Sequence, residues 1–166
     1  MTDGLRIREY DDTLAHHFHD INAAWIGAMF RLEPTDRDVL ENPRERIVDP
    51  GGVIMFVEHP QLGIIGTCAL QKTGDRQFEL TKMGVADAAR GRKAGEFLLN
   101  AMIARACGLG ANPLYLLTNR TCAAAIHLYE KVGFVHDAGV MEQFGRRYDR
   151  CNVAMLYVPK GDNQSH

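Results

Sequence analysis

Residues Val85–Leu99 have the sequence VADAARGRKAGEFLL, which joins the end of an expected strand to an amphipathic helix through a basic, glycine-rich turn. The first backbone N–H groups of a helix have no intrahelical partner, and with the helix dipole they favour an anion. Glycines allow the backbone to approach such a ligand, and cations attract it. We therefore predict an anion site formed by consecutive residues, namely Arg90, Gly91, Arg92, Lys93, Ala94 and Gly95. A solvated basic turn that only caps a helix is the alternative, because short glycine motifs often occur by chance.

The composition indicates one ordinary globular domain. The chain has 166 residues, of which 46% are hydrophobic and 24% charged, and its net charge is −2. We expect a single domain over residues 1–166, with 161–166 as a frayed polar tail. The charge balance gives no overall signature of nucleic-acid binding, and no apolar run approaches the roughly 18 residues that cross a bilayer. Four scattered cysteines without a CxxC pair, and an N-terminus without a signal-peptide core, predict a cytoplasmic protein with reduced thiols.

The spacing of apolar residues along the chain predicts an alternation of strands and helices around one sheet. We expect strands near 5–10, 53–58, 64–71, 77–85 and 113–118, a last hairpin of 134–140 with 153–158, and helices over 12–30, 34–42, 94–109 and 122–132. Only one helix separates the strand at 77–85 from the strand at 113–118, which implies that these two strands are parallel. The predicted fold class is therefore α/β, with a mixed, largely antiparallel central sheet flanked by helices.

Two segments resemble the GNAT superfamily of acetyl-CoA-dependent N-acetyltransferases. The turn is similar to the family's pyrophosphate loop at Arg90 and Gly95, although Lys93 stands where the first glycine usually lies. The second segment, AAAIHLYEKVGF at residues 123–134, is similar to the family's helix and following strand, with Tyr129 in the matching position. Cys122 replaces an asparagine that often contacts coenzyme A, and Asn119 lies nearby in a different register.

This resemblance implies an acyl-CoA N-acyltransferase fold and direct transfer of an acetyl group from acetyl-CoA to a primary amine, without a metal. It implies that the strand at 78–85 splays from the strand at 113–118, so that backbone groups of Met83, Gly84 and Val85 can pair with pantetheine. A backbone N–H near Met83 would polarise the thioester carbonyl. Tyr129 would face the sulfur as general acid, the alternative being a core tyrosine with its hydroxyl at the rim.

Glu79 matches the position of the family's general base. It lies six residues before Val85, or about 20 Å along an extended strand, which is comparable to the reach of a pantetheine arm. In a strand without a bulge, Glu79, Thr81, Met83 and Val85 share one face. Burial would raise the pKa of Glu79 toward working pH, whereas a solvent-facing strand glutamate is the alternative.

Other candidate residues leave alternatives open. His16 and His19 have metal-ligand spacing, but no third ligand lies nearby in sequence, so we expect no metal site. Glu33 and Asp36 fit either an acceptor pocket for a cationic amine or simple helix capping. The arginines of the FGRRYDRCN segment fit the acceptor site or the surface equally well.

The expected function is N-acetyl transfer, and the expected partner is a small-molecule or peptide amine rather than nucleic acid or membrane. A non-catalytic acyl-CoA-binding sensor or structural module is the alternative, and the presence of both Glu79 and Tyr129 argues against it. A nucleotide-binding enzyme is disfavoured, because the chain has no GKS or GKT and no GxGxxG after an early strand. Edge strands of the C-terminal hairpin would allow a homodimer.

Overall fold

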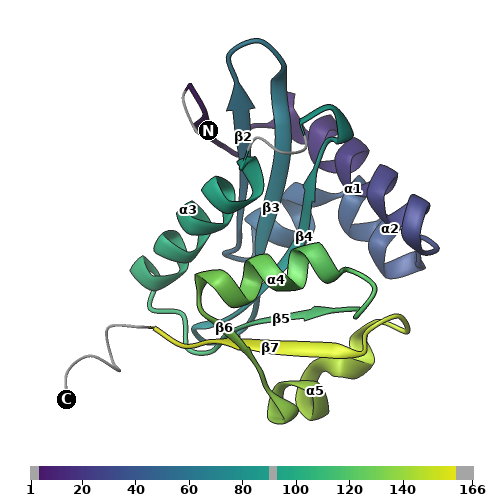
Figure 1. Cartoon of the computed structure of the whole chain (residues 1–166), viewed down its shortest axis with the longest axis vertical. Helices are drawn as coiled ribbons and strands as arrows, with labels where there is room; N and C mark the ends of the chain where they lie inside the picture. The colour runs from purple at the N-terminus through teal and green to yellow at the C-terminus, as the bar shows by residue number, and fades with distance from the viewer. Residues whose placement is uncertain (1–3, 90–92, 160–166) are drawn as a thin grey trace.

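One mixed sheet forms the centre of the molecule. The computed structural model describes residues 4–89 and 93–159. Within these ranges seven strands lie in the order β1–β2–β3–β4–β5–β7–β6 (Figure 1). Their bounds are β1 Arg6–Glu9, β2 Val53–His59, β3 Gly63–Gly74, β4 Gln77–Val85, β5 Leu114–Thr118, β6 Phe134–His136 and β7 Val153–Tyr157. The described pairs are antiparallel apart from β4 with β5, which confirms the predicted mixed, largely antiparallel sheet.

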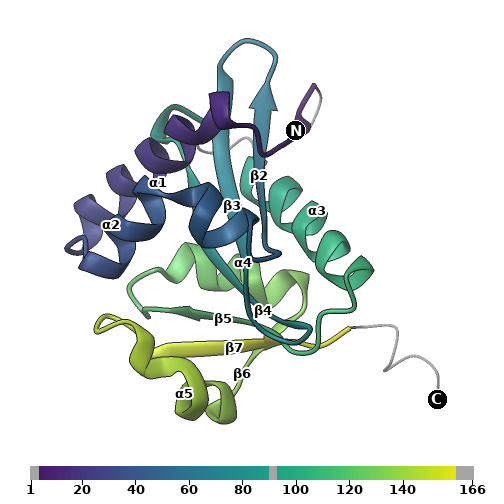
Figure 2. The same cartoon turned by 180° about the vertical axis from the view of Figure 1, so that it is seen from behind.

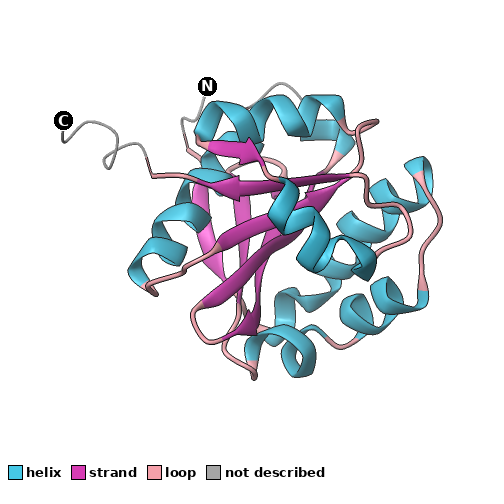
Figure 3. Cartoon of the chain, turned by 90° about the horizontal axis from the view of Figure 1, so that it is seen from below, coloured by secondary structure: helices cyan, strands magenta, loops and turns pink. Residues whose placement is uncertain are grey.

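Helices cover both faces of this sheet (Figures 2 and 3). They are α1 Ala15–Met29, α2 Pro34–Glu41, α3 Ala94–Gly108, α4 Ala123–Val132 and α5 Ala138–Phe144. The largest core cluster joins one face of the sheet to α3 and α4, through residues such as Leu98, Met102 and Tyr129. Two smaller clusters join the opposite face to α1, α2 and α5. Among the described residues, no helix is both long and apolar enough to cross a bilayer.

The C-terminal hairpin differs from the prediction. We expected a strand over residues 134–140, but β6 ends at His136 and α5 begins at Ala138. The cause is local, because the Asp137 side chain accepts a hydrogen bond from the Val140 backbone N–H and caps the helix. Val140 then packs with Tyr115 and Ala154 on the same face of the sheet as α2. The segment covers the sheet as a helix rather than extending it.

β4 and β5 separate after a short parallel ladder. They pair at Phe78 with Leu114, at Glu79 with Tyr115 and at Leu80 with Leu116, and the ladder ends there. β4 then runs on to Val85 and β5 to Thr118 without pairing with each other. This confirms the expected splay, which leaves backbone groups on the facing edges of both strands without a strand partner.

A bulge in β4 overturns the expected alternation of its side chains. Between the pairs Ala69–Thr81 and Thr67–Gly84, the single residue Cys68 stands opposite both Lys82 and Met83. Lys82 has φ of 53°, in the left-handed region. The extra residue reverses which face each later side chain occupies. Met83 and Val85 therefore pack toward α3 and α4, and the shared face expected of a strand without a bulge extends only from Glu79 to Thr81.

Candidate active site

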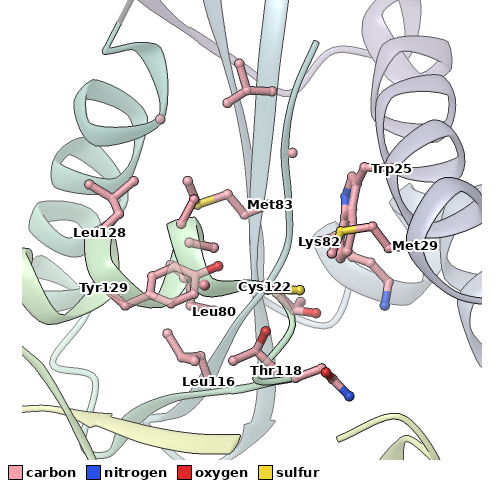
Figure 4. A pocket seen from close by; sticks show the side chains of 18 of the residues that line it. Trp25, Met29, Leu80, Lys82, Met83, Leu116, Thr118, Cys122, Leu128 and Tyr129 are labelled. Atoms are coloured by element: carbon pink, nitrogen blue, oxygen red, sulfur yellow. The ribbon is translucent and has the colours of Figure 1, made fainter. Parts of the chain in front are cut away.

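A cavity of about 850 Å³ opens where β4 and β5 separate. Figure 4 shows Met83 pointing toward Leu128 and Tyr129, while Lys82 points to the other side, toward Trp25 and Met29. Because of the bulge, the neighbouring residues Lys82 and Met83 lie on opposite walls of the cavity. Most of the site residues predicted from the sequence line this cavity, namely Met83, Gly84, Val85, Lys93, Ala94, Gly95, Asn119 and Tyr129.

One end of the cavity is the N-terminus of α3. Lys93 is the residue before the helix and adopts φ 58° and ψ 20°, a left-handed conformation that favours glycine. Lys93 therefore adopts the backbone conformation that a glycine would adopt at this position, at an energetic cost. Gly95 sits tightly, since an added Cβ would lie 3.3 Å from the Met83 Cε and 3.4 Å from the Leu128 Cδ2. Arg90, Gly91 and Arg92 lie outside the described residues, so the predicted anion site remains a prediction there.

Tyr129 forms part of the wall on α4. Its side chain is largely buried, with 8% of the residue exposed, and its hydroxyl is directed into the cavity near Leu80 and Cys122 (Figure 4). The ring packs edge-on against Phe134, with 6.0 Å between ring centroids. Burial raises the pKa of this phenol above its ordinary value, so the hydroxyl keeps its proton. The arrangement suits a proton donor that faces the cavity.

Glu79 lies behind the cavity lining rather than in it. Its side chain is fully buried, and neither carboxylate oxygen has a hydrogen-bond partner among the described residues. The nearest cation is Arg147, whose Nη1 lies 3.5 Å from the Glu79 Oε1. Burial raises the pKa of Glu79, and the positive charge of Arg147 opposes that shift. A carboxyl group in such surroundings titrates closer to neutrality than an exposed one.

Four charged side chains form an ionic cluster on the α2 side of β4: Glu33, Asp36, Lys82 and Arg150. Lys82 Nζ lies 3.0 Å from Asp36 Oδ1, and Arg150 donates to both Asp36 oxygens at 2.7 and 2.8 Å. Although burial alone would raise it, hydrogen bonds from Arg150 and the charge of Lys82 lower the pKa of Asp36 to about 2. Of the two predicted alternatives for α2 the structure shows helix capping, because Glu33 and Asp36 form a capping box, whereas neither side chain lines the cavity.

Sequence reasoning did not assign Lys82 to the site. An unbulged strand would point Lys82 away from Glu79, and only the positive φ at this position brings it to the α2 side. For the arginines of the FGRRYDRCN segment, the sequence fitted either the acceptor site or the surface, and the structure gives each arginine a different position. Arg150 lines the cavity, Arg147 pairs with Glu79, and Arg146 is exposed.

Asn119 has a structural task in addition to its place on the wall. Its Oδ1 accepts hydrogen bonds from the Thr121 backbone N–H and hydroxyl, and its Nδ2 donates to the Arg150 carbonyl at 2.6 Å. The side chain thereby ties the loop after β5 to the loop before β7. Contact between Asn119 and coenzyme A remains a prediction.

Comparison with known proteins agrees with this geometry. Residues 50–136 match the family model described as the acetyltransferase (GNAT) domain. A search of curated protein sequences finds no significant match. A GNAT family acetyltransferase from Staphylococcus aureus Mu50 has a TM-score of 0.81 at 21% identity, covering 92% of this chain and 98% of that one. An acetyltransferase from Streptococcus agalactiae has a TM-score of 0.77 at 18% identity, covering 95% and 99%.

A dodecameric spermidine N-acetyltransferase from Vibrio cholerae is also similar, with a TM-score of 0.70 at 22% identity over 98% of this chain and 97% of that one. At these identities the solved structures establish the shared fold, which is the acyl-CoA N-acyltransferase architecture. The family model covers more than half of the chain and carries the assignment. Because the sheet, the splay and the sequence model agree, this protein belongs to the GNAT family of acetyltransferases.

Proposed function

We propose that the protein transfers the acetyl group of acetyl-CoA directly to a primary amine, with both substrates bound together in the single domain of residues 1–166. One observation carries the proposal: a single cavity joins the N-terminus of α3, the free edge of β4 and the Tyr129 hydroxyl. These are the three features that an acyl-CoA acetyl donor requires, namely an anion site, backbone hydrogen-bond partners and a donor to the leaving thiolate.

The residues present fit a coenzyme A thioester. The first N–H groups of α3 suit a pyrophosphate, and the cationic residues Arg90, Arg92 and Lys93 precede the helix in the sequence. Beyond Leu80 the backbone of β4 has no β5 partner within the described residues, so Met83, Gly84 and Val85 can pair with the pantetheine amides. Met83 and Leu128 add apolar contacts to the arm.

Acetyl transfer needs a base that takes a proton from the acceptor ammonium and an acid that gives a proton to the leaving thiolate. Glu79 takes a proton from the acceptor ammonium through water, because its carboxylate lies behind the cavity wall. The amine nitrogen then bonds to the carbonyl carbon while a backbone N–H near Met83 donates to the carbonyl oxygen. The C–S bond breaks, and Tyr129 donates its proton to the departing thiolate. The nitrogen then loses its second proton, which restores the Tyr129 hydroxyl through solvent. An amide and a free thiol result.

A thiol-release assay tests the proposal. Acetyl-CoA and a panel of primary amines are mixed with the protein, and both free thiol and acetylated amine are quantified by mass spectrometry. We expect equal amounts of the two products, intersecting double-reciprocal plots, and no acetylated enzyme. Tight binding of acetyl-CoA without any amine product would instead support the alternative, a non-catalytic acyl-CoA-binding module.

The proposal also covers the cellular compartment and the oligomeric state of the protein. We propose a cytoplasmic enzyme that forms a homo-oligomer through an exposed sheet edge, since β6 is an edge strand and Val135 on it is 46% exposed. Light scattering during gel filtration measures this directly, and a monomer at micromolar concentration would contradict it.

A further inference from the structure

The part of the cavity beyond Tyr129 has an unusual charge pattern. We call it the acceptor end and define it by its lining residues Trp25, Met29, Phe30, Lys82, Tyr148 and Arg150. Among the described lining residues, the one carboxylate is Glu96, which lies in the first turn of α3 and pairs with Lys131 at 2.9 Å. The acceptor end therefore presents cations to a substrate and no carboxylate.

The carboxylates of the ionic cluster lie behind these cations. The Asp36 side chain is 0% exposed and the Glu33 side chain 13%, and neither lines the cavity. Arg150 is 17% exposed and does line it. The negative groups thus hold the cations in place from the protein side, and the substrate meets the positive side of the cluster.

Arg150 retains an unused pair of hydrogen-bond donors. Nη1 donates to Glu33 and Asp36 at 2.9 and 2.7 Å, and Nη2 donates to Asp36 at 2.8 Å. Among the described residues, Nε and the second Nη2 proton have no partner. This side-on edge of a guanidinium is the geometry that binds a carboxylate through two parallel hydrogen bonds.

The guanidinium is also fixed in orientation. Its Cζ lies 5.1 Å from the centroid of the Tyr148 ring and 5.8 Å from that of Phe30. The Arg150 backbone is held as well, because its carbonyl accepts from Asn119 at 2.6 Å. A donor edge held from several sides loses little entropy when it binds an anion.

Apolar side chains complete the acceptor end. Trp25 and Met29, from the C-terminal part of α1, and its C-cap residue Phe30 form this apolar wall. The Trp25 Nε1 already donates to Asn22 Oδ1 at 2.8 Å, so its ring offers the cavity an apolar surface. A substrate that fits this end combines an anionic group with an apolar body.

We propose that the acceptor is an α-amino acid with an apolar side chain, whose carboxylate binds the free edge of Arg150 and whose side chain packs against Trp25 and Phe30. The proposal rests on the proposed acetyl transfer and adds the class of acceptor. It also predicts that a polyamine is a poor acceptor, because the cavity offers it Lys82 and Arg150 but no carboxylate at this end.

The test is a matched acceptor panel. Leucine and phenylalanine are each compared with their amides and with the amines that lack the carboxylate, and spermidine is included. Because charged hydrogen bonds are lost without the carboxylate, we expect kcat/KM for each acid to exceed that of its neutral partners by at least about ten-fold. Equal values for acids and neutral amines, or spermidine as the best acceptor, would overturn the proposal.

One variant and one binding measurement test whether Arg150 causes the preference for acids over amides. In Arg150→Lys the charge opposite Asp36 is kept and the donor edge is lost, so the acid-to-amide ratio should fall toward one. Arg146→Lys, at an exposed position in the same segment, should keep the ratio of the parent protein. Calorimetry on protein saturated with coenzyme A should show heat with leucine and none with leucinamide, and equal heats would contradict the proposal. If no amine is acetylated at all, the proposed function itself fails.

Discussion

Glu79 is a carboxylate that folding leaves without a hydrogen-bond partner in the described structure. A buried polar group of this kind costs about 1–3 kcal/mol, more if it is charged. Ionisable groups with strongly shifted pKa values gather at functional sites. The burial of Glu79 behind the cavity lining is the reason for proposing a chemical role for it.

The variant Glu79→Gln removes this base with little change in shape. Loss of a general base is worth about 100- to 10,000-fold in turnover, so we expect kcat to fall within that range. Acetyl-CoA affinity, measured by calorimetry, should stay the same because Glu79 does not line the cavity. Glu142→Gln, at an exposed position on α5, is the matched control. Undiminished turnover in Glu79→Gln would remove Glu79 from the mechanism.

The pH dependence of kcat/KM should report the shifted pKa of Glu79. A base must be deprotonated to act, so activity should rise with pH through a pKa above the ordinary glutamate value of about 4.3. This acidic limb should disappear in Glu79→Gln. An acidic limb unchanged in that variant would assign it to another group.

Tyr129→Phe tests the proton donor at the other end of the reaction. We expect kcat to fall by about 100-fold, since the thiolate would leave without a proton. Because burial raises the pKa of Tyr129, ionisation of this phenol should not reduce parent activity below about pH 10. Tyr157→Phe is the control, because its ring also packs against Phe134. Equal losses in both variants would indicate packing rather than proton transfer.

At the scale of elements, the ionic cluster joins α2, β4 and the segment before β7 across the acceptor end. Asp36 is the shared partner, and its pKa of about 2 lies below the ordinary value of 3.8. A lowered carboxyl pKa means stabilisation that is present above the unfolded-state value and is lost as pH falls through the folded-state value. The ionic cluster should therefore stabilise the packing of α2, β4 and the segment before β7 at neutral pH, and this stabilisation should be lost in strong acid.

Asp36→Asn should destabilise the protein by about 3–5 kcal/mol at neutral pH, because the buried Lys82 loses its ion-pair partner and Arg150 keeps only Glu33. Urea unfolding at pH 7 and at about pH 2 measures this, and the difference from the parent should shrink at the lower pH. Asp38→Asn on the same helix, whose ion pair with Arg46 is half-exposed, should cost less than about 1 kcal/mol. Equal costs for the two variants would contradict the buried cluster.

Sequence patterns predicted most elements and missed the features that depend on single backbone angles. The bounds of β4 were predicted correctly, since its apolar run ends at a basic turn. The bulge at Lys82 was not predicted, because lysine at positive φ leaves no mark in the pattern. For this reason the faces of Met83 and Val85 were not foreseen and Lys82 was not considered for the site. Tyr129, on a regular helix, lines the cavity, and its role toward the sulfur stays a prediction.

At the scale of the molecule, the fold brings the N-terminus of α3, the splayed edge of β4 and the acceptor end into one cavity. The spermidine N-acetyltransferase from Vibrio cholerae shares this fold at 22% identity. The acceptor class proposed for the present protein rests on the cations that line the acceptor end and not on this likeness. A shared fold does not fix the acceptor, because the residues that line the site decide it.

Calorimetric titration of acetyl-CoA into the purified protein tests the central claim most directly, with ATP and NAD as comparison ligands. We predict one site per chain with a dissociation constant in the micromolar range, and no comparable heat from ATP or NAD. The absence of acetyl-CoA binding, or equal binding of ATP, would contradict the assignment of the cavity to an acetyl-CoA donor and with it the roles of Glu79 and Tyr129.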